Sequence, residues 1–208
     1  MSDLLTLASI GLVQLLGAMS PGPSFLLVAQ TAAAGSRRDG VMVALGLGLG
    51  AALWAFAALF GLNLLFQKSP MIYGGMRLAG ALFLMWIGFR IFRNAAKPLS
   101  LDAGSRGFVQ QPFVKGLLLQ ISNPKVVMFF SSIFIALLPK ETPTWMLVAL
   151  VGIVFCNDLW WYSLVSVFFA SGPVRGYYLR AKIWLDRVMG LALGALGLKL
   201  LWPLREAV

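Results

Sequence analysis

Two ionisable residues lie in the middle of long apolar runs, where a charge is costly. Lys125 is near the centre of Phe113–Leu138, and Asp158 is near the centre of Trp145–Ser171. A charged side chain in the middle of a bilayer costs at least about 2.5–3.5 kcal/mol on insertion scales, so it needs a partner or a polar cavity. The two residues could form a permanent pair that joins their segments. Alternatively they could face a ligand, Lys125 attracting an anionic group and Asp158 a cationic group or a transferable proton.

Proline motifs interrupt two of the apolar runs. Met19-Ser20-Pro21-Gly22-Pro23 lies in the first run, and Ile121-Ser122-Asn123-Pro124-Lys125 lies in the fourth. Proline breaks a helix interior but suits the first helical residue, and Ser and Asn are good N-cap residues. Each run is therefore predicted to form two half-helices, the second of which starts near the membrane centre. The alternative is that the prolines only kink continuous helices.

The N-termini of two half-helices at mid-membrane depth would favour an anionic ligand, because their free N–H groups carry partial positive charge. The sequence thus predicts a ligand site made of Ser20, Pro21, Gly22, Pro23, Ser122, Asn123, Pro124, Lys125 and Asp158, with Asp158 also the candidate for carrying a coupling proton. Candidates for the pocket wall are Gln14, Ser24, Gln120, Asn157 and Trp161, with Trp160 and Tyr162 beside them. Each of these, taken alone, could equally be a helix-packing contact.

The composition indicates an integral membrane protein. Of 208 residues, 60% are hydrophobic and 12% are charged, against about 45–50% and about 25% in soluble domains. The chain has one cysteine and no histidine, so disulfide frameworks, histidine-based catalysis and histidine metal sites are excluded, and we expect neither a metal nor a cofactor. The net charge of +10 is expected in the loops of a membrane protein rather than at a nucleic-acid interface.

Six segments are long and apolar enough to cross a bilayer as helices. They are Leu4–Ala34, Val41–Phe66, Met71–Phe92, Phe113–Leu138, Trp145–Ser171 and Ile183–Trp202. The first has no Lys or Arg before it and continues past Pro23, so we expect a retained helix rather than a signal peptide. The sequence therefore predicts an all-α fold in a single transmembrane domain, residues 1–208.

The positions of the basic residues predict the orientation of the spans. Most of them fall near the connections that follow the first, third and fifth spans: Arg37, Arg38, Arg90, Arg93, Lys97, Arg106, Lys115, Arg175, Arg180, Lys182 and Arg187. Basic loops face the cytoplasm. Both termini are therefore expected on the outer, periplasmic side of a multi-pass protein.

The two proline motifs also suggest an internal repeat. Pro21 precedes Pro124 by 103 residues, an offset that places spans one to three on spans four to six. Because each unit has an odd number of spans, the second copy must be inverted in the membrane. We expect repeat 1 at about 1–93, a linker at about 94–112 and repeat 2 at about 113–208. A 3+3 inverted repeat with helices interrupted at matching positions is typical of secondary transporters.

These motifs together resemble the lysine/threonine exporter (LysE/RhtB) family of bacterial inner-membrane amino-acid exporters. The matching features are Pro21-Gly22-Pro23, the segment 35–40 leading into the glycine-rich segment 45–50, the segment 121–125 with the following Phe129-Phe130, and Asp158. Two features depart from the family pattern. Asp39 stands where a less charged residue is expected, and Ser131-Ser132-Ile133-Phe134 is a loose match to the end of the fourth span.

The resemblance implies export of amino acids or related metabolites, driven by the membrane potential or the proton gradient. In this hypothesis the substrate carboxylate lies between the half-helix starts near Ser20–Gly22 and Asn123, helped by Lys125. Asp158 meets the amino group or carries the coupling proton, and the two halves rock about the site. The alternative of a metal-ion or small-cation exporter is disfavoured, because the sequence offers few hard oxygen ligands. The sequence contains no nucleophile–base pair that would indicate an enzyme. Buried charge is costly in a protein that only packs against others, which argues against a non-transporting assembly subunit. Among partners, assembly with further copies of the same chain is an open alternative.

Overall fold

The computed structural model is built of α-helices. It describes residues 2–34, 36–68, 70–97, 111–139, 142–170 and 172–201, and no strand occurs within these ranges. The helices of the described residues are α1 (Ser2–Met19), α2 (Pro23–Ala34), α3 (Arg37–Lys68), α4 (Pro70–Asn94), α5 (Pro112–Ile121), α6 (Pro124–Leu137), α7 (Thr144–Phe169) and α8 (Gly172–Leu201). The predicted all-α fold is confirmed. Most of the expected linker, residues 98–110, lies outside the described residues.

Both proline motifs break their helices. The axis bends by 58° between α1 and α2, and by 58° between α5 and α6. At the second break Pro124 is the first residue of α6, and the Asn123 side chain caps the new helix by accepting from the Lys125 N–H. The predicted half-helices are thus present, and the alternative of continuous, kinked helices is wrong. The reason is local, since a proline after a capping residue starts a helix better than it continues one.

Five of the six expected spans have counterparts that are long and apolar enough to cross a membrane. Three are single helices, within α3, α4 and α7, and two more result if each broken pair counts as one span. The sixth expected span, Ile183–Trp202, falls mainly on α8, which carries Lys182, Asp186, Arg187 and Lys199. Because of these charges, α8 is not among the helices that are apolar enough to cross a membrane. Trp202 lies outside the described residues. The sixth span and the inverted repeat therefore stay predictions.

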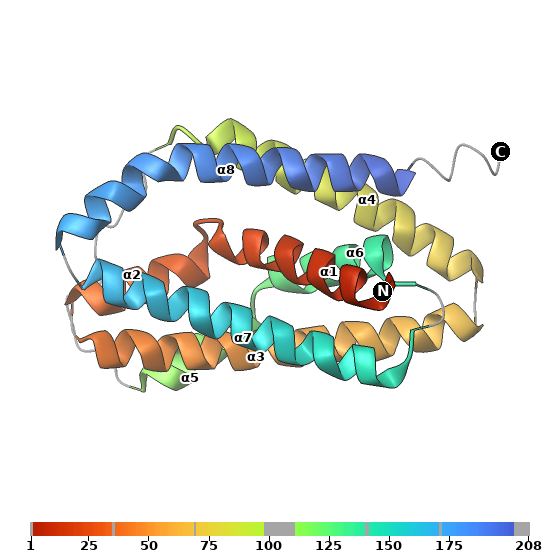
Figure 1. Ribbon diagram of the computed structural model, residues 1–208, viewed down its shortest axis with the longest axis horizontal. Helices are drawn as coiled ribbons and strands as arrows, with labels where there is room; N and C mark the ends of the chain where they lie inside the picture. The colour runs from red at the N-terminus through yellow and green to blue at the C-terminus, as the bar shows by residue number, and fades with distance from the viewer. Residues whose placement is uncertain are drawn as a thin grey trace.

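The helices form layers, with α1, α2 and α6 in the middle (Figure 1). α4 lies along α8 on one side of the bundle, and α3 packs on α5 and α7 on the other. Each half of the chain has the same element order, a broken pair followed by two long helices. The pair α1–α2 runs along the bundle in the direction opposite to α5–α6. The two breaks consequently lie near the middle of the long axis, where the polar residues of both motifs meet.

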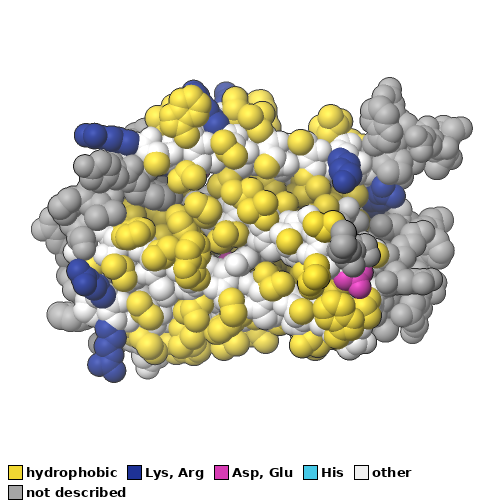
Figure 2. All heavy atoms as spheres, in the orientation of Figure 1, with side chains coloured by type: hydrophobic (Ala, Val, Ile, Leu, Met, Phe, Trp, Pro, Cys, Tyr) yellow, Lys and Arg dark blue, Asp and Glu magenta, His cyan; other side chains and the backbone are white. Residues whose placement is uncertain are grey.

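Different helix ends lie at the two ends of the bundle. The start of α1 and the end of α8 lie at one end, and the starts of α3, α5 and α8 lie at the other (Figure 1). Hydrophobic side chains cover much of the middle of the face seen in Figure 2, and the visible Lys and Arg side chains lie mostly toward the ends and the upper edge. Large apolar side chains such as Val148, Trp160 and Leu191 are more than half exposed. This distribution suits a surface surrounded by lipid.

Two apolar cores lie on either side of a polar centre. One core contains Ile10 of α1 and Val154 of α7, whereas the other contains Phe25 of α2 and Trp161 of α7. Between them along the chain come Gln14 on α1 and Asp158 on α7, both buried. The polar residues are therefore closed off from both ends of the bundle by packed side chains.

Glycines let the backbones of α4 and α8 approach closely. A Cβ atom at Gly190 would lie 2.6 Å from the carbonyl oxygen of Gly88, and a Cβ at Gly88 would lie 2.6 Å from the carbonyl oxygen of Gly190. Gly194, one turn further along α8, would place its Cβ in open space. Small residues four apart commonly allow membrane helices to pack closely, and here the close packing depends on the absence of a side chain at Gly190.

We expect Gly190→Ala to lower stability by about 1–3 kcal/mol, because α4 and α8 would have to separate or shift to admit the methyl group. Gly194→Ala is the matched control. It should be neutral or stabilising by up to about 1 kcal/mol, since alanine is the better helix former. Thermal unfolding of the detergent-purified variants measures the difference. Equal midpoints for the two variants would contradict the assigned contact.

Candidate functional site

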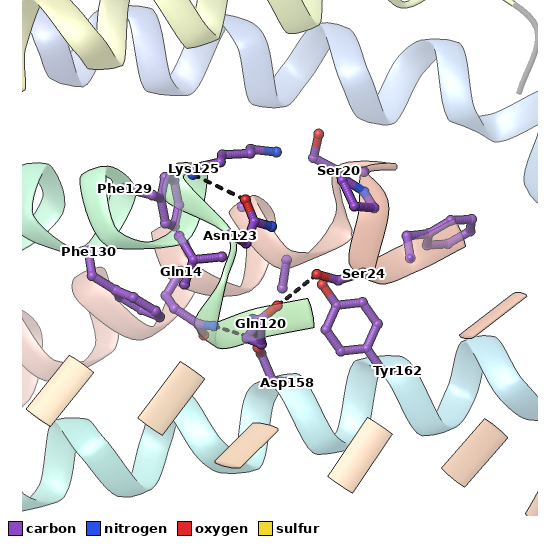
Figure 3. Close-up of a pocket in the computed structure, with 16 residues that line it drawn as sticks. Gln14, Ser20, Ser24, Gln120, Asn123, Lys125, Phe129, Phe130, Asp158 and Tyr162 are labelled. Carbon is purple, nitrogen blue, oxygen red and sulfur yellow. Dashed lines mark hydrogen bonds between the residues drawn. The ribbon is translucent and has the colours of Figure 1, made fainter. Parts of the chain in front are cut away.

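A carboxylate lies at the centre of the bundle. Asp158, on α7, is 2% exposed. Its Oδ1 accepts a hydrogen bond of 2.7 Å from Nε2 of Gln14, and its Oδ2 accepts one of 3.2 Å from Nε2 of Gln120 (Figure 3). Gln14 belongs to α1 and Gln120 to α5, the first parts of the two broken helices. The Asp158 side chain therefore connects α7 to both broken helices.

Further hydrogen bonds fix the orientation of both glutamine amides. The Gln14 Oε1 accepts from Asn157 Nδ2 at 2.7 Å, and Asn157 Nδ2 also donates to the Gly11 carbonyl at 3.0 Å. The Gln120 Oε1 accepts from the Ser24 hydroxyl at 2.7 Å. With both amide oxygens occupied in this way, both amide NH₂ groups are directed at Asp158. The result is one connected polar network among α1, α2, α5 and α7.

Lys125 does not form an ion pair with Asp158. Within the described residues the only ion pair is Lys182–Asp186, on α8. The Lys125 side chain leaves the start of α6 on the side away from Asp158 and extends toward the loop between α1 and α2 (Figure 3). Its Nζ lies 3.8 Å from the position that a Cβ of Gly22 would take. Of the two alternatives for these residues, the permanent pair is thus absent.

Lys125 and Asp158 nevertheless line the same central cavity. Its volume is about 50 Å³, and its walls are formed by Gln14, Gly17, Ala18, Ser20, Gly22, Pro23, Ser24, Phe25, Gln120, Asn123, Lys125, Val126, Phe129, Phe130, Asp158 and Tyr162. Sites for small molecules typically measure about 300–1,000 Å³. The cavity has room for a few water molecules only, so the structure holds the centre in a closed conformation.

The other residues of the predicted site lie elsewhere. Pro21 and Pro124 line a second, larger cavity beside α4 and α8, which Ser20 and Lys125 also line. Ser122 is exposed and faces a shallow groove near Lys115. Asn157 contributes to the network without lining the central cavity, and Trp161 is buried in an apolar core. The structure thus brings the two motifs together but divides their residues between two cavities.

The cavity wall contains aromatic residues that the sequence signalled only in part. Tyr162 lies one helical turn after Asp158, and Phe129 lies one turn after Lys125, so each shares the face of its charged neighbour. Trp160, by contrast, is 55% exposed. The same spacing rule, applied to α1, places Gly17 and Ala18 on the face of Gln14. A Cβ at Gly17 would collide with the Phe129 ring, so the glycine makes room for this aromatic part of the cavity wall.

Among the residues that the structure describes, no three His, Cys, Asp or Glu side chains come close enough together to bind a metal ion. The cavity instead combines one carboxylate, one ammonium group, amides, hydroxyls and the first turn of α2. The start of a helix attracts negative charge. Such a set of groups can bind a small molecule that carries both a positive and a negative charge.

The chain is similar to known membrane proteins over nearly its whole length. The family model described as LysE type translocator matches residues 15–203. The threonine efflux protein of Escherichia coli K12 is 30% identical over 202 residues, 95% of this chain and 98% of the relative. The threonine efflux protein of Salmonella typhi is 30% identical over 197 residues, 93% and 96% of the two chains. The uncharacterized membrane protein YahN of E. coli K12 is 35% identical over 192 residues, 88% and 83%. No solved structure matches the chain significantly.

We expect Asn123→Ala to lower stability by about 1 kcal/mol, because the α6 start loses the side-chain oxygen that caps the Lys125 N–H at 3.1 Å. Asn123→Asp should restore most of the loss, since its carboxylate can cap in the same way. The neighbouring Ser122→Ala, at an exposed position, should change stability by less than about 0.5 kcal/mol. Thermal unfolding in detergent compares the three. If Asn123→Ala and Ser122→Ala behave alike, the cap does not stabilise α6.

Proposed function

Because the chain belongs to the LysE type translocator family, we propose that it is a secondary transporter that exports amino acids across the bacterial inner membrane. The threonine efflux proteins that it matches over almost their full length make threonine and other small neutral amino acids the first substrates to test. The observation that carries the proposal is Asp158, a buried carboxylate that shares a central cavity with Lys125.

The cavity has a place for each charged group of an α-amino acid. On one side are the Lys125 ammonium, close to Gly22, and the first turn of α2, which together attract a carboxylate. On the other side is Asp158, which attracts an ammonium group. Ser20, Ser24 and Tyr162 add hydroxyl groups between the two. A zwitterion therefore finds an opposite charge at both ends, whereas an amine or a carboxylic acid leaves one charged residue without a partner.

Substrate binding requires the centre to open. In the closed conformation Gln14 and Gln120 hold α1 and α5 against Asp158. A substrate ammonium that binds Asp158 competes with these two amides, and thereby weakens the contacts that join α7 to both broken helices. The proposed cycle alternates between two conformations in which the cavity opens to one side and then to the other. Asp158 therefore couples substrate binding to the opening of the centre.

Proton coupling follows from the same competition. A charged carboxylate in an apolar bundle is costly without a cation, and among the described residues Asp158 has no ion-pair partner. Either a proton or the substrate ammonium compensates the charge, and both cannot occupy Asp158 at once. We propose that they alternate there, so that one proton enters for each substrate molecule that leaves.

The other classes of function gain no comparable support. A metal-ion exporter would need a ligand cluster, which the described part of the chain lacks. The family is one of translocators, which favours transport over catalysis and over a purely structural subunit.

We expect Asp158→Asn to abolish proton-driven transport while the protein still folds. In proteoliposomes with an acidic interior, the unmodified protein should accumulate labelled threonine, and a protonophore should collapse the accumulation. The amide introduced by the substitution cannot exchange a proton or neutralise an ammonium group, so accumulation should fall to the level of empty vesicles. Asp3→Asn, near the end of the bundle, is the control and should transport normally, and thermal unfolding checks that both variants fold. Accumulation by Asp158→Asn at the normal rate would remove Asp158 from the mechanism.

We expect competition to require both charges of the substrate. Unlabelled serine and homoserine should compete with labelled threonine in counterflow. Propionate and ethanolamine, each lacking one charged group, should compete at least about tenfold more weakly, because a charged hydrogen bond contributes about 1.5–3 kcal/mol. Lysine and glutamate extend the panel. If no amino acid exchanges with its own label, the chain is not an amino-acid exporter.

A further inference from the structure

A second cavity lies beside the centre, between the helix breaks and the α4–α8 layer. Its volume is about 490 Å³, which is within the range of small-molecule sites and far above the 50 Å³ of the central cavity. It follows one face of α4 from Phe83 to Asn94, a length of about 16 Å at the helical rise. Ser20 and Lys125 line both cavities, so the two are neighbours that share a wall.

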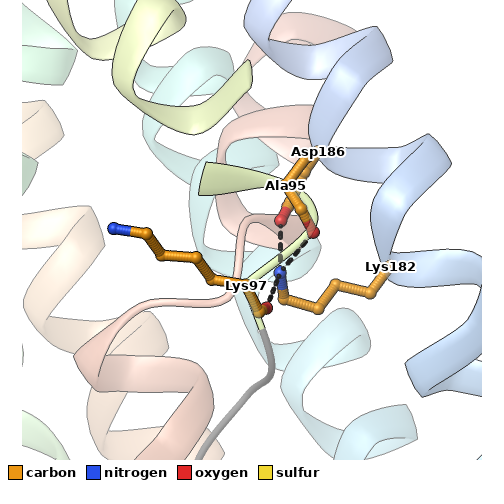
Figure 4. Close-up of polar contacts among 4 residues, drawn as sticks. All are labelled: Ala95, Lys97, Lys182 and Asp186. Atoms are coloured by element: carbon orange, nitrogen blue, oxygen red, sulfur yellow. Dashed lines mark hydrogen bonds and ion pairs between the residues drawn. The ribbon is translucent and has the colours of Figure 1, made fainter. Parts of the chain in front are cut away.

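A buried ion pair shapes the outer part of this cavity. Lys182 and Asp186, on successive turns of α8, are 6% and 4% exposed. The Lys182 Nζ donates to the carbonyl oxygens of Ala95 at 3.0 Å and Lys97 at 3.2 Å, and to Asp186 Oδ2 at 2.9 Å (Figure 4). These three bonds use all three ammonium hydrogens. Lys182 therefore joins α8 to the chain just after α4 and has no donor left for a ligand.

Asp186 has one oxygen to spare. Its Oδ1 is buried and has no hydrogen-bond partner among the described residues, although Asp186 lines the cavity. A buried carboxylate oxygen without a donor is costly, so the position favours a ligand that donates. An ammonium group supplies such a donor.

Cations without ion-pair partners line the same cavity. Arg90, with its guanidinium 4.9 Å from the centre of the Trp86 ring, and Lys125 both face the space, and the only ion pair of the described residues leaves both out. Lys97 adds a further positive charge at the end where α4 finishes. A ligand with a carboxylate is thus attracted toward Arg90 and Lys125.

From this arrangement we propose that the cavity beside α4 and α8 is a second binding site for an α-amino acid zwitterion. Its ammonium group donates to Asp186 Oδ1, and its carboxylate binds Arg90 and Lys125. The inference rests on the proposed transport function and makes this cavity the place where substrate waits before the centre opens. It lies toward the end of the bundle that carries the basic connections, the end predicted to face the cytoplasm. Lys125, common to both cavities, can hold the carboxylate while the substrate passes from one to the other.

Thermal shift of purified variants separates the two sites. In Asp158→Asn, threonine at millimolar concentration should still raise the unfolding midpoint, because the outer site remains. In the double variant Asp158→Asn/Arg90→Gln the rise should disappear, whereas Asp158→Asn/Arg93→Gln, changed one turn further along α4 at a residue that does not line the cavity, should retain it. A rise in the unmodified protein that is absent from Asp158→Asn would overturn the second site. So would an undiminished rise in the double variant with Arg90→Gln.

Transport kinetics provide an independent measure. Arg90→Gln should raise the threonine concentration for half-maximal transport at least tenfold with little change in maximal rate, and Asp186→Asn should act in the same direction if it folds. Arg93→Gln should change neither quantity. Unchanged half-saturation in Arg90→Gln, with transport intact, would refute the outer site and leave the proposed function standing. The absence of amino-acid transport by the unmodified protein would instead refute the proposed function.

Discussion

The hydrogen bonds of one buried carboxylate connect the parts of this protein. Asp158 is placed where apolar cores close it off on both sides, and its two oxygens take amide donors from α1 and α5. A charge in such surroundings is tolerated only if polar groups surround it. Both broken helices must therefore bring a glutamine to the same point. Any motion that opens the centre has to provide a substitute for these bonds.

The helix breaks make this polar centre possible in an apolar bundle. Each break ends one helix and starts another at mid-length, which exposes capping side chains and backbone groups inside the protein rather than at its ends. One set of these groups, with Gln120 and Ser24, completes the network around Asp158. A second set of groups, which includes Lys125, lines the cavity beside α4 and α8. The same two interruptions thus contribute to a small central cavity and to a larger one beside it.

The charges of α8 have a structural explanation. Lys182 and Asp186 lower the apolar character of that helix, yet both are buried and face the cavity rather than the outside of the bundle. Their pairing also satisfies backbone carbonyls after the end of α4. Further along, the contact at Gly88 and Gly190 keeps the two helices close. Ionisable residues in membrane helices are typically found facing the interior in this way.

The amino-acid sequence alone predicts the all-α fold, five candidate spans and both helix breaks, because hydropathy, proline and capping act within a few consecutive residues. It also identified most of the polar residues that meet at the centre. Their partners, by contrast, follow only from the folded bundle. Asp158 contacts Gln14, 144 residues away, and not Lys125, and Asp186 became a cavity residue that no local pattern marked. These outcomes depend on how each helix is rotated about its axis and which faces meet. Packing across the whole bundle sets that rotation, and it is not encoded in any one segment.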